Sequence, residues 1–497
     1  MGINRGLPKG SASDAYAAVR KRIDALLFAI TIAIIVLIAR SSAHAQLFWD
    51  TGNGSGLQSG NGTWSTGAPN WNTAAAPANS QVVWAQNSDA VFQTNGTSLV
   101  TVSGPVQVNS ITFNGTGYTI GGTTLTLTGA NITANADATI SAILDGSVGL
   151  TKLGNSILTL SGANNYTGGT TLSAGTLRLS GTGTLGATTN NLTINAGTLD
   201  LNGTNQIVGA LNGTGGTILN NSSGASSNTL TIGNGNGSGT FSGTITDHTT
   251  GSGALQLIKI GTGTETMTST TSNYTGGTTI NGGTIIANSA NGGALGRGPV
   301  VVNNTGTLRG SGLIDATVTV NNGGTLAPGA TASAGSIAKI QTGTNPGTGN
   351  VNLASGSNFI LDLTAGAGPT AVGGGTIYDQ LSVIGSVTLG GGSLTLNPGA
   401  GLMLGDKFFI VLNDSIDLVS GTFNNLPNAS MFSTGGYSFL INYADNGDNS
   451  GVPNDISLTV QPTLVPEPNT WIGGGLALAG VGFMQRRRLR GLIARKA

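Results

Sequence analysis

The seven residues Asn165-Tyr166-Thr167-Gly168-Gly169-Thr170-Thr171 recur in the same order as Asn273-Tyr274-Thr275-Gly276-Gly277-Thr278-Thr279, and this repetition decides the fold. Each copy precedes a Gly-Thr-aliphatic step, Gly175-Thr176-Leu177 in the first and Gly283-Thr284-Ile285 in the second. Further Gly-Thr-Leu steps begin at Gly183, Gly197, Gly306 and Gly324. The spacing from Gly175 to Gly197, and from Gly306 to Gly324, is about 20 residues, a period that indicates a solenoid with one coil per repeat.

Short segments between these steps alternate apolar and polar residues, which predicts strands with one buried face. They are Leu158-Thr159-Leu160, Leu177-Arg178-Leu179, Leu192-Thr193-Ile194, Val318-Thr319-Val320 and Leu394-Thr395-Leu396. Clusters of Asn and Gly, such as 321–324, supply the left-handed backbone that tight turns need. Stacking the coils pairs the backbone of each with its neighbours, about 4.8 Å apart. The predicted fold is therefore all-β, a parallel β-helix.

The composition agrees with this fold and excludes several functions. Of 497 residues, 84 are Gly and 14 are Pro, and only 8% are charged. None is Cys, which excludes thiol chemistry and disulfides. Between residues 46 and 462 there are seven basic and sixteen acidic residues, a formal charge of −9. That charge argues against nucleic acid or anionic lipid as a partner.

The four tryptophans Trp49, Trp64, Trp71 and Trp84 depart from the low aromatic content of the chain. We expect this segment to form an N-terminal cap over the first coil, because an open solenoid end is an unpaired sheet edge. The alternative is an aromatic platform that stacks on sugars.

The N-terminus has the three parts of a secretory signal peptide. Basic residues at 20–22 precede an apolar run at 25–39, and Ala43-His44-Ala45 is a small-x-small site that predicts cleavage between Ala45 and Gln46. The alternative is a retained membrane anchor, although the run is short for a bilayer.

At the C-terminus, Val465-Pro466-Glu467-Pro468 precedes an apolar run at 471–484 and the basic residues Arg486, Arg487 and Arg488. The arginines are expected to stay on the cytoplasmic side of a membrane segment. The arrangement resembles the PEP-CTERM sorting signal of Gram-negative bacteria. The resemblance implies recognition of Pro466, Glu467 and Pro468 by an exosortase, a membrane transpeptidase. The alternative is a plain membrane anchor.

Three stretches of the body carry a family pattern: Gly149-Leu150-Thr151-Lys152-Leu153-Gly154, 158–171 and 310–329. They resemble the autotransporter-associated β-strand repeat of passenger domains. The resemblance implies an extracellular right-handed parallel β-helix with an adhesive or structural role. After Val460 the chain has no room for a translocator barrel, so we expect other secretion machinery to export it. The second repeat has Glu265-Thr266-Met267 where the first has Leu158-Thr159-Leu160, so that coil is expected to be irregular.

These patterns divide the chain into five parts: a signal peptide (1–45), an N-terminal cap with the first strands (46–110), a β-helix of repeats (111–345), C-terminal β-helix coils (346–462) and the sorting signal with its membrane segment (463–497).

The sequence offers little catalytic chemistry. His248 lacks a nucleophile motif and is expected to be a solvated turn residue. The loop from Asp445 to Gly451 is rich in oxygen atoms that could attract Ca²⁺, but the spacing of a calcium-binding EF-hand fails at Ile456. We expect an Asx-rich turn, with a calcium site as the alternative. We therefore predict no catalytic residue, cofactor or metal ligand. Acids on neighbouring coils would be stacked, so spacing alone leaves a paired carboxylate site open.

The expected function is that of an exported, exosortase-processed solenoid at the cell surface or in the extracellular matrix, structural or adhesive and in contact with exopolysaccharide. The alternative is a carbohydrate-active enzyme, a polysaccharide lyase or hydrolase on the same scaffold. Repetition favours the first, because many weak sites combine into avidity.

Overall fold

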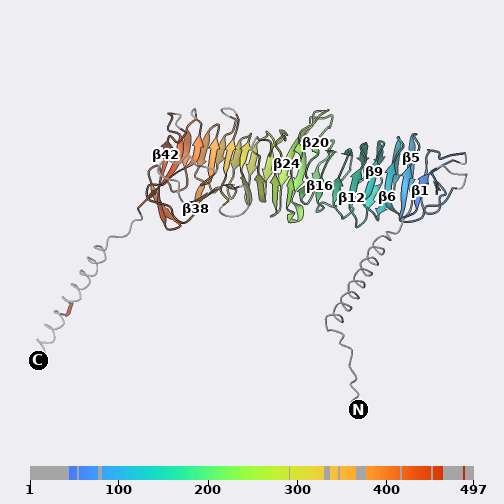
Figure 1. Ribbon diagram of the computed structural model, residues 1–497, viewed down its shortest axis with the longest axis horizontal. Coiled ribbons are helices and arrows are strands. Elements are labelled where there is room, and N and C mark those ends of the chain that lie inside the picture. Colours follow the sequence, from blue (N-terminus) through green and yellow to red (C-terminus); the bar gives the residue numbers. More distant parts are fainter. Residues whose placement is uncertain are drawn as a thin grey trace, which may run out of the picture.

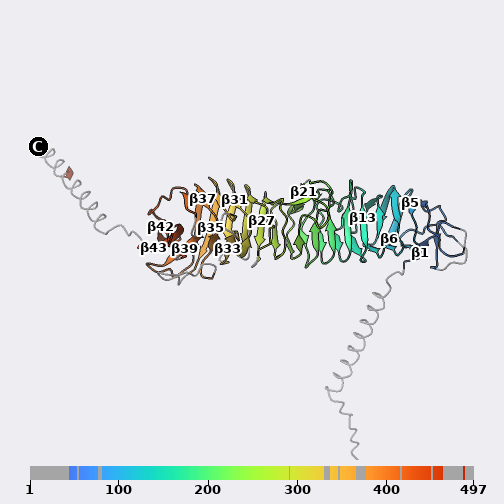
Figure 2. The ribbon, with the colours of Figure 1, turned by 90° about the horizontal axis from the view of Figure 1, so that it is seen from above.

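The computed structural model describes residues 44–52, 55–75, 81–225, 227–289, 292–329, 336–344, 348–364, 376–414, 417–448, 451–462 and 485–486. Strands stack along one axis into an elongated rod, with β1 near one end and β42 near the other (Figures 1 and 2). The described residues form an all-β structure apart from a short 3-10 helix, η1 (Asn234–Asn236), and the helical pair 485–486. Within these ranges no helix has the length and apolar character to cross a bilayer.

Two sheets run along the N-terminal half of the rod. Sheet A contains, in spatial order, β19 (Leu211–Asn212), β16 (Leu192–Ile194), β14 (Thr170–Leu172), β12 (Leu150–Leu153), β9 (Asn131–Ala134), β6 (Val106–Phe113), β4 (Ser88–Phe92), β1 (Gln46–Trp49) and β3 (Trp71–Asn72), with β8 (Thr124–Leu127) beside β6 and β11 (Ile143–Asp145) beside β8. Sheet B contains β2 (Gly62–Trp64), β5 (Ser98–Val102), β7 (Tyr118–Gly122), β10 (Ala138–Ile140), β13 (Ile157–Leu160), β15 (Thr176–Leu179), β17 (Thr198–Asp200), β20 (Thr217–Leu219) and β23 (Thr244–Ile245).

Three sheets run along the C-terminal half. Sheet C contains β18 (Gln206–Ile207), β21 (Ser227–Ile232), β24 (Ala254–Lys259), β26 (Thr278–Ile280), β28 (Val300–Val302), β31 (Val318–Val320), β34 (Val351–Leu353), β37 (Val387–Gly390) and β40 (Val419–Thr422). Sheet D contains β22 (Gly239–Phe241), β25 (Thr264–Met267), β27 (Gly283–Ala287), β29 (Gly306–Gly310), β32 (Thr325–Pro328), β35 (Asn358–Leu363) and β38 (Ser393–Pro398). Sheet E contains β30 (Gly312–Ile314), β33 (Lys339–Thr342), β36 (Gln380–Val383), β39 (Lys407–Asn413), β43 (Asp455–Gln461), β42 (Tyr437–Asp445) and β41 (Met431–Thr434).

The coils stack in parallel, which supports the predicted β-helix. In sheet A, Leu150 pairs with Thr170 and Thr170 with Leu192, so one coil takes about 20 residues, as expected. In sheet C the coils lengthen towards the C-terminus, since Val318 pairs with Val351 and Val351 with Val387, a spacing of roughly 35 residues. The sheet E strand β30 already fits in the shorter coil between Val300 and Val318, so the extra residues lie mainly in the connections between strands.

The two sequence repeats occupy different faces of the rod. Sheet A passes into sheet D through Gly213, which forms a parallel bridge with Phe241 and whose N–H donates to Thr240 O (3.0 Å). The first repeat places β12 and β14 in sheet A and β13 and β15 in sheet B, whereas the second places β24 and β26 in sheet C and β25 and β27 in sheet D. Since sheet D continues sheet A, the second repeat is rotated by one face about the axis. The change begins at β18, which starts sheet C.

The core is a column of aliphatic side chains from stacked strands. Each inward position lies directly above its equivalent in the preceding coil, as in this fully buried row from sheet B: Leu158, Leu177, Leu199, Ile218 and Ile245. Burial of each such side chain stabilises the fold by about 2 kcal/mol. Outward positions such as Thr159 are half-buried, which confirms the predicted alternation.

The expectation of an irregular coil in the second repeat is wrong. Strand β25 pairs in unbroken parallel register with β22 on one side and β27 on the other. Glu265 and Met267 take the two inward positions and are both fully buried. Hydrogen bonds to β22 and β27 keep the backbone of β25 regular, so the strand forms although a carboxyl group enters the core.

The four tryptophans pack into the core at the β1 end of the rod. All four indoles are 2% exposed or less, and their ring centroids lie 4.7 to 5.1 Å from one another in the contacting pairs. Phe92 continues the cluster towards the first regular coils. Because the rings are buried, they offer no face to a sugar, which contradicts the aromatic-platform alternative.

The described structure ends in antiparallel strands beyond the last parallel coils. Strand β43 pairs antiparallel with β39 and β42, and β42 pairs antiparallel with β41. The β41–β42 hairpin turns through Gly435 (φ +58°) and Gly436 (φ +83°), the left-handed pair that a tight hairpin requires.

Glycine is required where the backbone of one coil touches the next. Gly197 has φ +79°, and a Cβ atom there would lie 2.3 Å from Gly175 O in the adjacent coil. Gly181 has φ +57°, but a Cβ atom there would meet nothing within 4 Å.

We predict that Gly197→Ala lowers the free energy of unfolding by about 3 kcal/mol, since it adds a backbone clash to the left-handed strain. The matched control Gly181→Ala should lose about 1 kcal/mol, because it adds the left-handed backbone strain without a clash. Thermal unfolding followed by circular dichroism measures both. Equal losses would show that contact between coils does not select glycine.

Candidate functional site

The repeated heptapeptide serves the core rather than the surface. Tyr166 is fully buried and its hydroxyl lies 2.6 Å from Thr170 Oγ1, and Tyr274 makes the same contact with Thr278 Oγ1 (2.6 Å). Burial raises the pKa of both phenols, so they stay neutral. This identical pair explains why the Tyr-x-x-x-Thr spacing recurs.

Two lysines close turns from inside the rod. Lys152 Nζ donates to the carbonyls of Leu153 (2.9 Å), Gly154 (2.7 Å) and Ala174 (3.1 Å). Lys259 takes the equivalent place in the second repeat, with Nζ 2.7 Å from Ile260 O. Burial lowers the pKa of Lys152 to about 8, while Asp137 acts in the opposite direction. The lysines therefore have a structural role.

The outer surface carries the groups that a ligand could reach. Most Gly-Thr steps place their threonines in two outward columns of stacked strands. On sheet B the column is Thr176, Thr198, Thr217 and Thr244, and on sheet D it is Thr264, Thr284, Thr307 and Thr325. The step at Gly183 is an exception, since Thr184 lies in a turn and donates to Asn164 O (2.7 Å).

Asparagines form amide ladders beside these columns. Asn303 Nδ2 donates to Asn281 Oδ1 (2.7 Å), and Asn321 Nδ2 donates to Asn303 Oδ1 (2.7 Å). Such ladders follow from in-register stacking, because identical amides then lie at hydrogen-bonding distance. A shallow groove of about 380 Å³ runs between Asn281 and the threonines at 284 and 307.

The outer face of sheet B holds a second groove, of about 370 Å³, which we call the sheet B groove. It is lined by Thr116, Gly117, Tyr118, Thr119, Asp137, Ala138, Thr139, Ile157, Thr159 and Arg178. Its floor is the in-register column Thr119, Thr139, Thr159 and Arg178. The groove therefore combines three hydroxyl rungs with a cation at one end.

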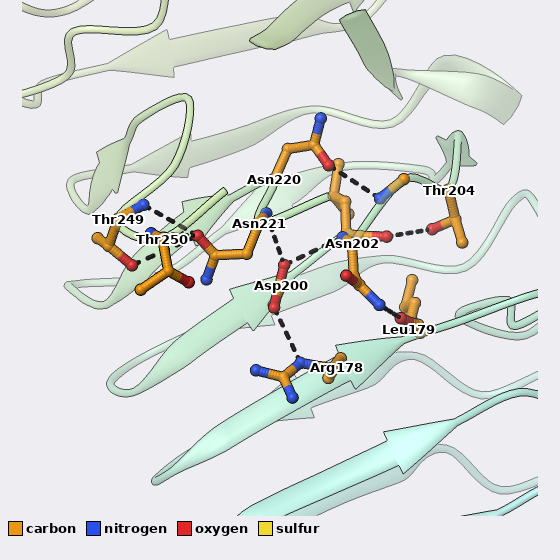
Figure 3. A network of polar contacts seen from close by, with 11 residues as sticks. Arg178, Leu179, Asp200, Asn202, Thr204, Asn220, Asn221, Thr249 and Thr250 are labelled. Atoms are coloured by element: carbon orange, nitrogen blue, oxygen red, sulfur yellow. Dashed lines mark hydrogen bonds and ion pairs between the residues drawn. The ribbon is translucent and has the colours of Figure 1, made fainter. Parts of the chain in front are cut away.

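Arg178 is held by a buried carboxylate in the next coil (Figure 3). Its Nε lies 3.0 Å from Asp200 Oδ2, and Asp200 Oδ1 accepts from the N–H groups of Asn202 (3.0 Å) and Asn221 (3.0 Å). The Asp200 side chain is 1% exposed and that of Arg178 is 36% exposed. The two terminal guanidinium nitrogens have no partner in the part of the chain that the structure describes, and Figure 3 shows them directed away from this network.

The predicted processing residues are only partly described. Ala45 and Gln46 lead into the rod, where Gln46 opens β1 and Ala45 O accepts from Asp89 N (2.8 Å). Arg486 lies in the helical pair 485–486. Ala43, Val465, Pro466, Glu467, Pro468, Arg487 and Arg488 lie outside the described residues, as do both predicted membrane segments.

The two remaining candidates for chemistry are engaged locally. His248 is exposed, with Nδ1 3.1 Å from Gly253 O, and Asp247 accepts from Thr275 Oγ1 (2.7 Å). In the acidic loop, the Asp445 carboxylate contacts Lys407 Nζ (2.5 Å) and Ser457 Oγ (2.5 Å). Among the described residues, no group of three or more His, Cys, Asp or Glu is placed to hold a metal ion.

Two of the buried acids that sequence reasoning missed have a strongly raised pKa. Asp379 accepts from the N–H groups of Ala338 (2.8 Å) and Asp362 (2.9 Å), and burial raises its pKa to about 7. Glu265 Oε2 accepts a long bond from Leu211 N (3.4 Å), Oε1 has no partner among the described residues, and burial raises its pKa to about 8. Asp379 and Asp362 flank the antiparallel bridge between Leu363 and Tyr378 and are at most 4% exposed, so this acid pair is closed to a substrate. The inward position of Glu265 in an alternating strand was the available signal.

Comparison with known proteins supports the predicted repeats. Residues 150–179 and 257–287 match the Passenger-associated-transport-repeat family, and they coincide with β12–β15 and β24–β27. A stretch of 265 residues is 32% identical to the adhesin BmaC autotransporter of Brucella suis biovar 1 (strain 1330). That stretch is 52% of this chain and 7% of the relative. The body is therefore passenger-like, and the sorting signal stays a prediction.

We predict that Glu265→Gln stabilises the rod at pH 8 and leaves its stability unchanged below pH 4. The wild-type carboxyl group has a pKa raised from 4.5 to about 8 by burial, so the folded state favours its neutral form. The wild type therefore loses stability as pH rises from about 4.5 to 8, by on the order of a few kcal/mol, and the amide does not. Melting temperatures of both proteins between pH 4 and 9 test this, and a constant difference would contradict it.

Proposed function

We propose that this chain is an exported β-solenoid of a Gram-negative bacterium, displayed at the cell surface or in the extracellular matrix, with a structural and adhesive role and in contact with exopolysaccharide. The observation that carries the proposal is the rod itself, whose outer faces present uncharged hydroxyl and amide groups in register from coil to coil. The similarity to an adhesin over half of the chain supports it.

The chemistry of these faces fits many weak contacts. Stacked strands repeat a hydroxyl about every 4.8 Å, and each hydrogen bond exchanged with water contributes little by itself. A polymer that reaches several rungs binds them intramolecularly, so its avidity exceeds the affinity for any one rung. A long polysaccharide with regularly spaced hydroxyl groups is such a polymer.

We favour a non-enzymatic role over a polysaccharide lyase or hydrolase. Glycoside hydrolysis commonly needs two carboxyl groups about 5 to 10 Å apart that both face the substrate. Asp362 and Asp379 are buried, and Asp445 is bound to Lys407. Asp137 and Asp315 do line surface grooves, but each is the single acid among the described residues of those linings, so no second carboxyl group faces a substrate there.

Finer features of the exported rod are further proposals. We infer right-handed winding, since crossovers between parallel strands are right-handed in about 98% of cases. Residues 46–110 would form an N-terminal cap with the first strands. Residues 463–497 would form a sorting signal whose membrane segment holds the chain until an exosortase-type enzyme acts at Pro466, Glu467 and Pro468. Secretion machinery would carry the chain outward.

We predict that purified residues 46–462 precipitate with the exopolysaccharide of the host bacterium, and that cells lacking the gene adhere less to a surface coated with it. The same protein incubated with pectin, alginate or that exopolysaccharide should release no reducing or unsaturated ends. Turnover of any of the three would support the enzyme instead.

We predict that Glu467→Ala leaves an unprocessed protein in the membrane fraction, because it removes the charged residue of the Pro-Glu-Pro element. Immunoblotting of cell fractions for size and location measures this. The control Asn469→Ala, next to the element, should be processed normally. Unchanged size and destination for Glu467→Ala would leave the plain-anchor alternative.

A further inference from the structure

We propose that the sheet B groove binds an acidic polysaccharide, with a uronic acid carboxylate on Arg178 and neighbouring sugar hydroxyls on Thr119, Thr139 and Thr159. This inference deepens the proposed adhesive function and rests on it, since it names the ligand class and the face that binds it. Three features of the groove support it: the fixed arginine, the hydroxyl column and the fully paired strands of its floor.

Arg178 is prepared to receive a carboxylate. Asp200 holds its Nε at 3.0 Å and is itself fixed by the backbone N–H groups of Asn202 and Asn221. This leaves the two terminal nitrogens for a ligand, in a guanidinium whose orientation is already set. Arginine pairs with a carboxylate through charge-assisted hydrogen bonds, and a fixed side chain loses less entropy on binding.

The hydroxyl column leads directly to that arginine. Thr119, Thr139 and Thr159 are in register on successive coils, and the next outward residue of the column is Arg178. Asp137 lies on the rim of the same groove, where Ile157 N donates to its Oδ1 (2.8 Å). Its carboxylate can accept sugar hydroxyls but repels a second acid, so the groove fits a polymer with spaced carboxylates.

The backbone of the groove is unsuited to binding a peptide. Strands β10, β13 and β15 are each paired on both sides, so no sheet edge is available for an added strand. The lining offers hydroxyls, one acid and one base, without the deep apolar pocket that anchors peptide side chains. The net charge of −9 between residues 46 and 462 also disfavours dense polyanions.

Binding of a hyaluronan octasaccharide, with one carboxylate per disaccharide, and of its carboxyl-reduced form tests the proposal by calorimetry on the exported chain. The wild type should bind the acidic form at least tenfold more tightly than the reduced form. Arg178→Gln should bind both forms equally and weakly. The matched control Arg297→Gln removes a cation that is 68% exposed and lies outside this groove, and it should behave as the wild type.

Two further variants keep the test informative if Arg178→Gln does not fold. Thr139→Val removes one hydroxyl from the column while keeping a β-branched residue, and it should weaken both ligands several-fold. Arg178→Lys keeps the charge but loses the planar fork, so its preference for the acidic form should fall. The proposal is overturned if the wild type shows no preference for the acidic form, or if Arg178→Gln retains it.

Cell adhesion separates this proposal from the proposed function. Cells that display Arg178→Gln and adhere as well as the wild type, while the purified wild type shows no acid preference, would refute the groove and leave the adhesive role intact. Wild-type cells that do not adhere to exopolysaccharide would refute the adhesive role itself.

Discussion

The parallel stacking of one coil on the next is the constraint on which the rest of this structure depends. Strands as short as Leu192–Ile194 have no stable partner within their own coil, so their backbone groups are satisfied only by the coils on either side. Stacking then fixes the distance between coils and leaves no room for a Cβ atom where backbones touch, as at Gly197. The abundance of glycine and the scarcity of large side chains follow from this contact.

The same constraint determines how polar groups enter the interior. Lys152 and Asp200 are fully buried, and each binds several backbone groups at a turn. Burial of a charged group without such partners would be costly. These side chains therefore hydrogen-bond the backbone at the turns and hold neighbouring coils together. Glu265 departs from the pattern because one carboxylate oxygen lacks a partner among the described residues. Burial raises the pKa of this carboxyl group.

On the outside, stacking converts a sequence step into a surface. A Gly-Thr step that recurs once per coil becomes a column of hydroxyls, and a recurring asparagine becomes an amide ladder. Where a different residue enters a column, as Arg178 does after Thr159, a cation stands in line with the hydroxyls.

The sequence by itself determined the coil, because alternation in Leu158-Thr159-Leu160 and the glycines of the turns are local features that depend on near neighbours. The recurrence of Tyr166 at Tyr274 indicated a repeat, but that both rings are buried came from the structure. Only the tertiary structure decided that the second repeat lies one face further round, that Glu265 belongs to a regular strand, and that Arg178 meets Asp200 beside three threonines. All three features depend on the register between coils. The lengths of many turns together set that register, so no short stretch of sequence can predict it.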